Sequence, residues 1–300
     1  MLVRYLAVLL LASAGLAAAE RSVADLIDKA TTALSQFSFD QPRKPFRLAR
    51  ERAAKGSPEW QQATFGLATC QHHIAPATVE GIAEATALYA ELAATAPDST
   101  YTSRCVLNLG RLAELVDFYQ DPVDIAEARA RYREVAQRWP TQDIAGEATF
   151  RLASSLVQSL AADDLAQAIT TLDGWLASHP QEPLAPAMWQ YLGDVHFLYR
   201  QDWQAALDAY RKADDLGLIW AGREAIVWWR MAVLAETKLN DRATAIRYYT
   251  RICTDGQTSG KAFEAQLALA RLGVQPPELS AFATYPGAKP VFTVAPGVAP

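Results

Sequence analysis

The sequence predicts an all-α fold, a right-handed α-solenoid of about five helix-turn-helix repeats followed by a closing helix. Three observations predict it: an alanine recurs every 38 to 43 residues, apolar residues follow it four and seven positions later, and a proline or glycine then stops the helix. The five copies are Ala85-Tyr89-Leu92-Pro97, Ala128-Tyr132-Val135-Pro140, Ala168-Leu172-Trp175-Pro180, Ala206-Tyr210-Ala213-Gly217 and Ala245-Tyr249-Ile252-Gly256. Repeats of this period bury their apolar faces on one another rather than closing a core of their own.

Residues 1–19 have the three parts of a secretory signal peptide. Arg4 supplies a positive start, residues 6–16 form an uncharged apolar stretch, and Ala17 and Ala19 place small residues before Glu20. The apolar stretch is short for a membrane span, and no later segment is apolar enough to be one. We therefore expect an exported protein, periplasmic or secreted, with no membrane span.

Residues 20–57 are expected to form a helical pair ahead of the repeats. The first helix is expected over residues 22–37, where apolar side chains recur at helical spacing. These side chains are Val23, Leu26, Ile27, Ala30 and Leu34. Pro42 and Pro45 then break the chain before a second helix, expected over roughly residues 46–55.

Residues 184–217 show the repeat most clearly. Trp189, Leu192, Gly193 and His196 share one face of a first helix, Gln201 and Asp202 make the turn, and Ala206, Tyr210 and Ala213 form the inner stripe of a second helix. Gly193 and Ala206 are small because the two helices are expected to cross closely there. Ala232 takes the place of Gly193 in the next repeat.

This pattern resembles the tetratricopeptide repeat, in which W-x2-L-G-x2-Y is followed by A-x3-F and a proline. Trp189, Leu192, Gly193 and His196 with Ala206 and Tyr210 match it, and so do Leu109 and Gly110 with Ala128, Tyr132 and Pro140. The repeats are longer than the usual 34 residues, which makes the chain similar to divergent repeats of bacterial envelope proteins. The resemblance covers about residues 58–272, which we interpret as a repeat array.

The array is expected to end in a closing helix over residues 261–272, which contains Phe263, Leu267 and Leu272. Residues 273–300 form a proline-rich tail with only two charged side chains, Glu278 and Lys289. Proline at this density blocks helix and sheet hydrogen bonding, so the tail is expected to be extended or disordered. It could bind an aromatic groove, be a plain chain end, or fold back over the last helix.

The net charge and the cysteine positions argue against nucleic-acid binding and against a disulfide bond. A net charge of −5 does not suit nucleic-acid binding, which depends on an excess of basic residues. The three cysteines, Cys70, Cys105 and Cys253, all fall in expected helices, where cysteine is most often a small buried apolar residue. Cys70 and Cys105 are expected to lie roughly 10 Å apart on neighbouring helices, too far for a disulfide.

No catalytic, cofactor-binding or metal-binding residue is expected. The chain contains no P-loop and none of the zinc-protease, zinc-finger or serine-hydrolase motifs. His196 occupies a packing position of the repeat, and His179 precedes a helix-stopping proline. Cys70, His72 and His73 are close in sequence, but adjacent helical residues point about 100° apart and cannot easily share a metal. These observations favour a protein that is not an enzyme.

A basic cluster of Arg43, Lys44, Arg47, Arg50, Arg52 and Lys55 allows two interpretations. Arg43, Arg47 and Arg50 fall on one side of a helix, where an acidic peptide or another anionic surface could dock. The simpler interpretation is a solvated helix face with Glu51 and Glu59 as local partners, and it is favoured because most charge runs are only solvated.

The resemblance implies that first helices line a concave groove that binds a segment of a partner protein. The positions that flank the Leu-Gly pair are expected to face this groove. They are Leu107, Arg111, Gln190, Asp194, Trp229 and Val233. Trp229 is either an exposed anchor for the partner or a packing residue against the neighbouring repeat, and the sequence does not decide between these.

The function expected from these features is that of a non-enzymatic, exported scaffold that binds a protein or peptide. The resemblance implies a role in envelope assembly. The alternative is a saccharide-binding module or an accessory domain of a cell-wall-acting enzyme system, because eight tryptophans could stack on sugars. The two differ in one observable property: sugar sites need exposed aromatic faces, whereas the tryptophans of a scaffold should be buried.

We predict that the mature protein begins at or near Glu20 and is found outside the cytoplasm, because residues 1–19 provide a cleavable leader. N-terminal sequencing of the protein from fractionated cells tests this. Retention of Met1, or residence in the cytoplasm, would contradict the prediction.

Overall fold

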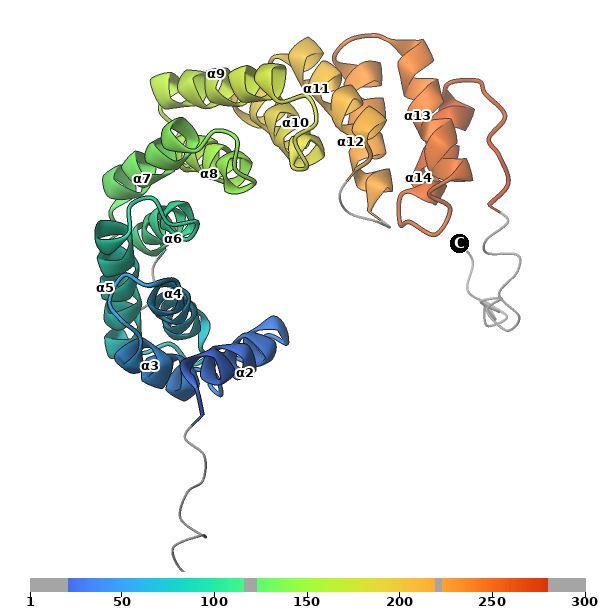
Figure 1. Cartoon of the computed structure of the whole chain (residues 1–300). Helices are drawn as coiled ribbons and strands as arrows, with labels where there is room; N and C mark the ends of the chain where they lie inside the picture. The colour runs from blue at the N-terminus through green and yellow to red at the C-terminus, as the bar shows by residue number, and fades with distance from the viewer. Residues whose placement is uncertain (1–20, 116–122, 219–222, 280–300) are drawn as a thin grey trace, which may run out of the picture. The chain divides into compact units, whose positions relative to one another are not determined.

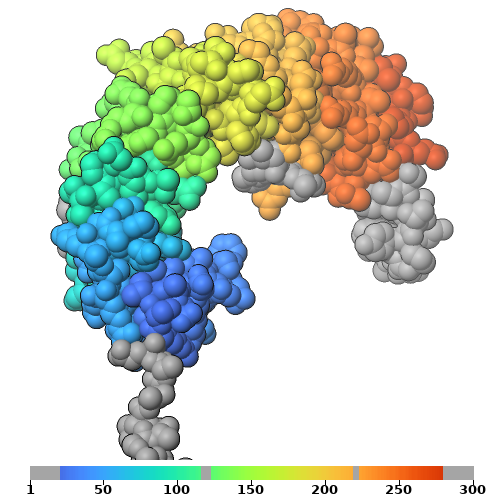
Figure 2. Space-filling view, viewed as in Figure 1, coloured from blue at the N-terminus to red at the C-terminus, as the bar shows by residue number. Residues whose placement is uncertain are grey.

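The computed structural model describes residues 21–115, 123–218 and 223–279, and every regular element in these ranges is a helix (Figure 1). The chain forms two compact units, the N-terminal unit of residues 1–155 and the C-terminal unit of residues 156–300. Within each unit, side chains fill the spaces that the ribbon leaves between neighbouring helices (Figure 2). The expected signal peptide and the tail beyond residue 279 lie outside the described ranges.

The helices follow the order that the repeats predict. In the N-terminal unit, α2 (Val23–Ser35) and α3 (Arg43–Arg52) precede α4 (Pro58–His73), α5 (Val79–Thr95), α6 (Thr102–Glu114) and α7 (Ile125–Arg138), and α8 (Ile144–Gln158) crosses the boundary. The C-terminal unit contains α9 (Ala162–Ser178), α10 (Ala185–Val195), the π-helical turn η1 (His196–Arg200), α11 (Trp203–Leu216), α12 (Glu224–Thr237), α13 (Arg242–Thr254) and α14 (Ala262–Arg271). Five helix pairs, α4/α5 to α12/α13, and the closing helix α14 confirm the predicted all-α fold.

Most second helices begin at a side chain that caps them. Thr78, Asp124, Asp202 and Asp241 each accept a hydrogen bond from a backbone N–H in the first turn of α5, α7, α11 and α13. Such a cap satisfies a backbone donor that has no partner inside the helix. Helix α9 is the exception, because its N-cap residue is Ala161, whose methyl group cannot accept a hydrogen bond.

Helix α3 begins three residues earlier than the sequence suggested. Pro45 was expected to break the chain before the helix, but it lies inside the first turn, with Pro42 at the N-cap position. Proline lacks only the N–H, and the first backbone N–H groups of a helix have no helical acceptor, so the first turn tolerates it.

The recurring alanines lie in the core. Ala85, Ala128, Ala168, Ala206 and Ala245 are all buried, and so are the tyrosines that follow four of them, Tyr89, Tyr132, Tyr210 and Tyr249. In two repeats the tyrosine ring lies against a glycine of the first helix. A Cβ atom added to Gly193 would lie 2.5 Å from the ring of Tyr210, and one added to Gly110 would lie 2.7 Å from the ring of Tyr132.

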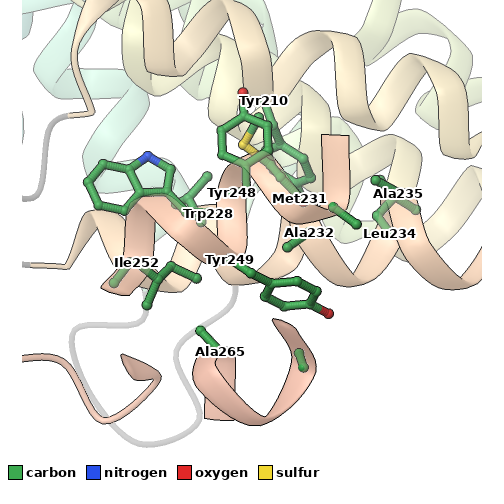
Figure 3. Close-up of a cluster of buried hydrophobic side chains, with 14 of the residues drawn as sticks. Tyr210, Trp228, Met231, Ala232, Leu234, Ala235, Tyr248, Tyr249, Ile252 and Ala265 are labelled. Carbon is green, nitrogen blue, oxygen red and sulfur yellow. The ribbon is translucent and has the colours of Figure 1, made fainter. Parts of the chain in front are cut away.

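The core of the C-terminal unit continues this packing to the end of the chain (Figure 3). Tyr210, Trp228, Met231 and Tyr249 belong to one buried cluster, in which Ala232 provides the small residue. Beyond α14, Val274 and Leu279 pack against the same cluster, and Gln266 Nε2 donates a hydrogen bond of 2.7 Å to the Pro277 carbonyl. The described start of the tail therefore runs back over α14. Two apolar residues of α14, Phe263 and Leu267, remain exposed.

The three cysteines are buried and unpaired, as expected. No helix within the described ranges is long and apolar enough to cross a membrane.

We predict that Gly193→Ala lowers the free energy of unfolding by about 1–3 kcal/mol, because the new methyl group would collide with a rigid buried ring. Gly174→Ala is the matched control. Gly174 also lies within a helix, but an added Cβ would meet nothing within 4 Å. This change should stabilise the protein by about 0.5–1 kcal/mol, the usual gain for glycine to alanine in a helix. Urea denaturation measures both, and equal effects of the two substitutions would contradict the predicted close contact.

Candidate functional site

A set of three side chains recurs along the described helices, in which a tyrosine and an arginine contact one carboxylate. The tyrosine comes from the second helix of a repeat, the acid from its first helix, and the arginine from the first helix of the next repeat. The sets are Tyr132-Glu114-Arg151, Tyr210-Asp194-Arg230 and Tyr249-Glu236-Arg271. Each carboxylate therefore joins two consecutive repeats.

In the second and third sets the geometry is that of charge-assisted hydrogen bonds, whereas Arg151 lies 3.9 Å from Glu114. The Tyr210 hydroxyl donates to Asp194 Oδ1 at 2.6 Å, and the Tyr249 hydroxyl donates to Glu236 Oε2 at 2.8 Å. Arg271 contacts both oxygens of Glu236, at 2.7 and 2.8 Å. Burial, and then the neighbouring carboxylate, raises the pKa of both tyrosines, so their hydroxyls stay protonated and remain donors at neutral pH.

Two repeats depart from this arrangement. In α4/α5 the Tyr89 hydroxyl reaches Thr69 Oγ1 at 3.4 Å instead of an acid. In α8/α9 the tyrosine position holds Leu172, which is fully buried but has no hydroxyl. The corresponding positions of α8, Ser154 and Val157, provide no carboxylate.

Asp194 and Arg230 form the polar wall of a cavity of about 180 Å³ between α10 and α12. Arg230 donates to Asp194 and also to the Tyr210 hydroxyl, so the ring position of Tyr210 helps to fix this wall. The other lining residues are Gln190, Leu218, Arg223, Glu224, Ile226 and Val227.

A second cavity of about 390 Å³ adjoins the first at the start of α12 and α14. It is lined by Arg223, Ala225, Ile226, Ser259, Gly260, Lys261 and Glu264. Arg223 and Ile226 belong to both cavities, and Ile226 is 50% exposed. The two cavities therefore form one surface, with an exposed apolar side chain at its centre. We call the residues that line them the α10–α14 surface.

The charged groups of this surface largely neutralise one another. Asp194 pairs with Arg230, and Lys261 pairs with Glu264 at 2.8 Å. A surface of paired charges around an apolar centre suits a polypeptide segment better than a strongly charged ligand.

Of the six residues expected to face a groove, Gln190 and Asp194 line this surface. Leu107 does not, because it is buried in the core with an exposed fraction of 4%. Arg111 lies in the N-terminal unit, where it donates to Asn108 at 3.5 Å. Trp229 and Val233 pack against the core cluster, and Lys261 covers a face of Trp229. For Trp229, the structure favours the packing interpretation.

The repeat pattern in the sequence does not predict Ile226 and Arg230 as residues of this surface. They lie four residues apart on α12, so they share one face of that helix. A pattern that could have revealed Arg230 is an acid followed by an arginine 35 to 37 residues later, which occurs in all three sets.

No group of three or more His, Cys, Asp or Glu side chains in the described ranges could hold a metal ion. His72 and His73 stack with ring centroids 4.2 Å apart, and burial lowers the pKa of His72 to about 3. Both imidazoles are therefore neutral packing groups at neutral pH.

Solved structures with a similar fold are tetratricopeptide-repeat proteins. The chain aligns with PilF of Pseudomonas aeruginosa at 19% identity, with a TM-score of 0.53, over 83% of this chain and 97% of PilF. It aligns with the C-terminal part of a TPR repeat-containing protein of Cytophaga hutchinsonii at 15% identity, with a TM-score of 0.58, over 82% of this chain and 86% of that one. No family model and no curated protein matches the sequence.

These likenesses concern the fold. Together with the helix pairs they confirm the predicted resemblance: the chain has a TPR-like helical-repeat fold.

We predict that Tyr210→Phe lowers the free energy of unfolding by about 1–2 kcal/mol, because Asp194 loses a hydrogen-bond donor while the ring still fills its space. Tyr249→Phe should have a similar effect through Glu236. Tyr199→Phe, at an exposed tyrosine, is the control and should change stability by less than about 0.5 kcal/mol. If all three variants unfold at the same urea concentration as the wild-type protein, the tyrosine–carboxylate bonds do not stabilise the fold.

Proposed function

We propose that the protein is a non-enzymatic scaffold that binds an extended segment of a partner protein on the α10–α14 surface. The observation that carries this proposal is Ile226, half-exposed between two cavities whose polar walls are already held in place. A few residues that pack into desolvated pockets provide most of the affinity at protein interfaces, and fixed polar groups around them provide orientation.

The chemistry of the walls suits a peptide. The Gln190 side-chain amide can both donate and accept a hydrogen bond, as a peptide group requires. An apolar side chain of the partner would contact Ile226, while Gln190 and Glu224 meet its backbone. Because Asp194 and Arg230 are tied to each other and to Tyr210, little side-chain entropy is lost when the segment binds.

The tryptophans do not favour the saccharide-binding alternative. All seven that the structure describes are buried or partly buried, and each has a cation or a histidine ring against a face, with separations of 3.7 to 5.8 Å. The pairs are Trp60 with Arg50 and Lys55, Trp139 with Arg138, Trp175 with His179, Trp189 with Lys212, Trp203 with Lys238, Trp228 with Arg251 and Trp229 with Lys261. Sugar stacking needs an aromatic face that is open to solvent.

The proposal places this scaffold outside the cytoplasm, with a role in envelope assembly. It is supported by Arg4, the apolar stretch of residues 6–16 and the small residues before Glu20. The TPR-like fold is compatible with this role but does not select it, since one fold serves many functions.

We predict that a photo-crosslinking amino acid at position 226 forms discrete adducts with a partner protein in intact cells. Position 198 is the matched control, because Leu198 is similarly exposed, at 54%, in the same unit but lines neither cavity. Mass spectrometry of the adducts identifies the partner. A second experiment then compares Ile226→Asp with Leu198→Asp, and only the first should weaken binding.

Two results would contradict the proposal. Equal cross-linking from positions 226 and 198 would show that the surface has no preferred partner. Normal binding by Ile226→Asp would show that the partner docks elsewhere on the chain.

A further inference from the structure

The sequence allows a docking face for an anionic partner on the side of α3 that carries three arginines, but in the structure these charges are already matched. Each arginine pairs with a carboxylate of the protein itself. The pairs are Arg43 with Asp40 at 3.2 Å, Arg47 with Glu84 at 2.7 Å and Arg50 with Glu91 at 2.5 Å. These acids are not the Glu51 and Glu59 that the sequence suggested. This side of α3 therefore offers a partner no unpaired arginine.

Phe37, in the connection between α2 and α3, is the most exposed large apolar side chain that the structure describes, with an exposed fraction of 83%. Its neighbours in the chain are uncharged, because residues 30–39 contain no acidic or basic side chain. Phe39, two residues later, is partly buried and packs its ring against His73, with the ring centroids 5.5 Å apart. The connection thus packs one phenylalanine into the fold and presents the other to solvent.

The backbone conformation of Phe37 is also unfavourable for its residue type. Its φ is +57°, in the left-handed region, where a bulky residue is an outlier. The Phe37 N–H donates to the Leu34 carbonyl at 3.0 Å, and the Ser38 N–H donates to the Ala33 carbonyl at 3.1 Å. These are the two bonds of the Schellman motif, in which glycine is the usual residue at the position of Phe37. The requirements of the fold alone would therefore favour glycine here.

The other non-glycine residues with positive φ have a reason in the repeat. Leu160, Gln201 and Asn240 each directly precede the N-cap residue of a second helix, so the tight turn of the repeat imposes their backbone conformation. Phe37 lies in a seven-residue connection, residues 36–42, five positions before the N-cap of α3. No such turn requires its conformation.

We propose that Phe37 is an anchor that inserts into an apolar pocket of a partner protein. Its side chain is exposed to water and its backbone is strained, and such local violations are found where function requires them. The centres of protein interfaces are enriched in aromatic residues and depleted of charged ones, which matches a ring among uncharged neighbours. The site belongs to the N-terminal unit and does not depend on the α10–α14 surface.

The end of α2 indicates the charge beside the partner's pocket. The C-terminal end of a helix carries a partial negative charge, and the last turn of α2 contains no basic side chain. A lysine or arginine beside the pocket would complement this end of the helix. A membrane surface fits less well, because segments that bind membranes combine apolar with basic side chains, and residues 30–39 have no basic one.

The connection presents Phe37 in a fixed position. The Schellman bonds hold its backbone, and Phe39 is packed against His73 two residues later. Little conformational entropy is therefore lost when the ring enters a pocket.

A photo-crosslinking amino acid at position 37 in intact cells tests the proposal. It should form a discrete adduct with a partner protein, which mass spectrometry identifies. Position 160 is the matched control, because Leu160 is also an exposed apolar residue, at 60%, with a φ of +58°. Adducts from position 37 but not from position 226 would support the anchor while contradicting the α10–α14 surface, and the reverse result would overturn the anchor alone.

Binding of the purified partner then separates an anchor from a structural residue. Phe37→Gly should weaken binding at least about tenfold, as expected when an aromatic anchor is lost. Leu160→Gly should change binding less than about twofold. Neither change should lower the urea midpoint of unfolding, because glycine relieves the left-handed strain and neither side chain is buried.

The predicted charge of the partner is tested at Gln36, an exposed side chain beside Phe37. Gln36→Lys should weaken binding about threefold or more by repelling the partner's cation, whereas Gln36→Glu should not weaken it. Equal effects of the two changes would overturn the cationic rim.

Three results would overturn the anchor itself. The first is equal cross-linking from positions 37 and 160, or normal binding by Phe37→Gly. The second is an adduct only with another copy of this chain. The third is the absence of a protein adduct together with sedimentation on phosphatidylcholine vesicles that Phe37→Gly abolishes, which would assign the ring to a membrane surface.

Discussion

The close approach of two helices, permitted by a glycine or alanine and filled by a tyrosine ring, is the constraint on which the rest of this structure depends. At Gly193 a single added carbon would collide with the ring of Tyr210. Because the ring has only one place to go, its hydroxyl has a fixed position, and that position is within hydrogen-bond distance of Asp194. The carboxylate then fixes Arg230 from the next first helix. The packing inside one repeat thus positions the side chains that form an ionic contact between two repeats.

The same chain of contacts shapes the proposed binding surface. Asp194 and Arg230 would be mobile charges if they stood alone, but each is held by a partner that the core has already positioned. Basic side chains also lie over the faces of several tryptophans, which leaves few aromatic surfaces open to solvent. What remains exposed and apolar between the two cavities is Ile226. A rigid polar wall beside an exposed apolar residue is well suited to select one segment of a partner.

The second helices could be predicted from the sequence because their requirements are local: one alanine, a ring or leucine four residues later, and a stop. The proposed binding surface could be predicted only in part. The repeat pattern identifies equivalent positions of successive first helices, such as Gln190 of α10 and Trp229 of α12. The cavity between α10 and α12 is lined by Gln190 of α10 but by different positions of α12, Ile226 and Arg230. A search for equivalent positions therefore finds only one of its two walls. Leu107 shows another limit, because an apolar residue at such a position turns into the core. The ion pairs of α3 were likewise hidden from the sequence, since the acids that pair with Arg47 and Arg50 are Glu84 and Glu91 of α5, about 40 residues along the chain.

The α8/α9 repeat lacks most of these devices, and the boundary between the two compact units falls within α8. Leu172 takes the place of the tyrosine, Ala161 takes the place of the capping residue, and α10 contains no arginine. The α10–α14 surface lies within residues 156–300. All the residues that line its two cavities therefore come from the C-terminal unit, and the fixed side chains of α10 and α12 are enough to shape the proposed binding surface.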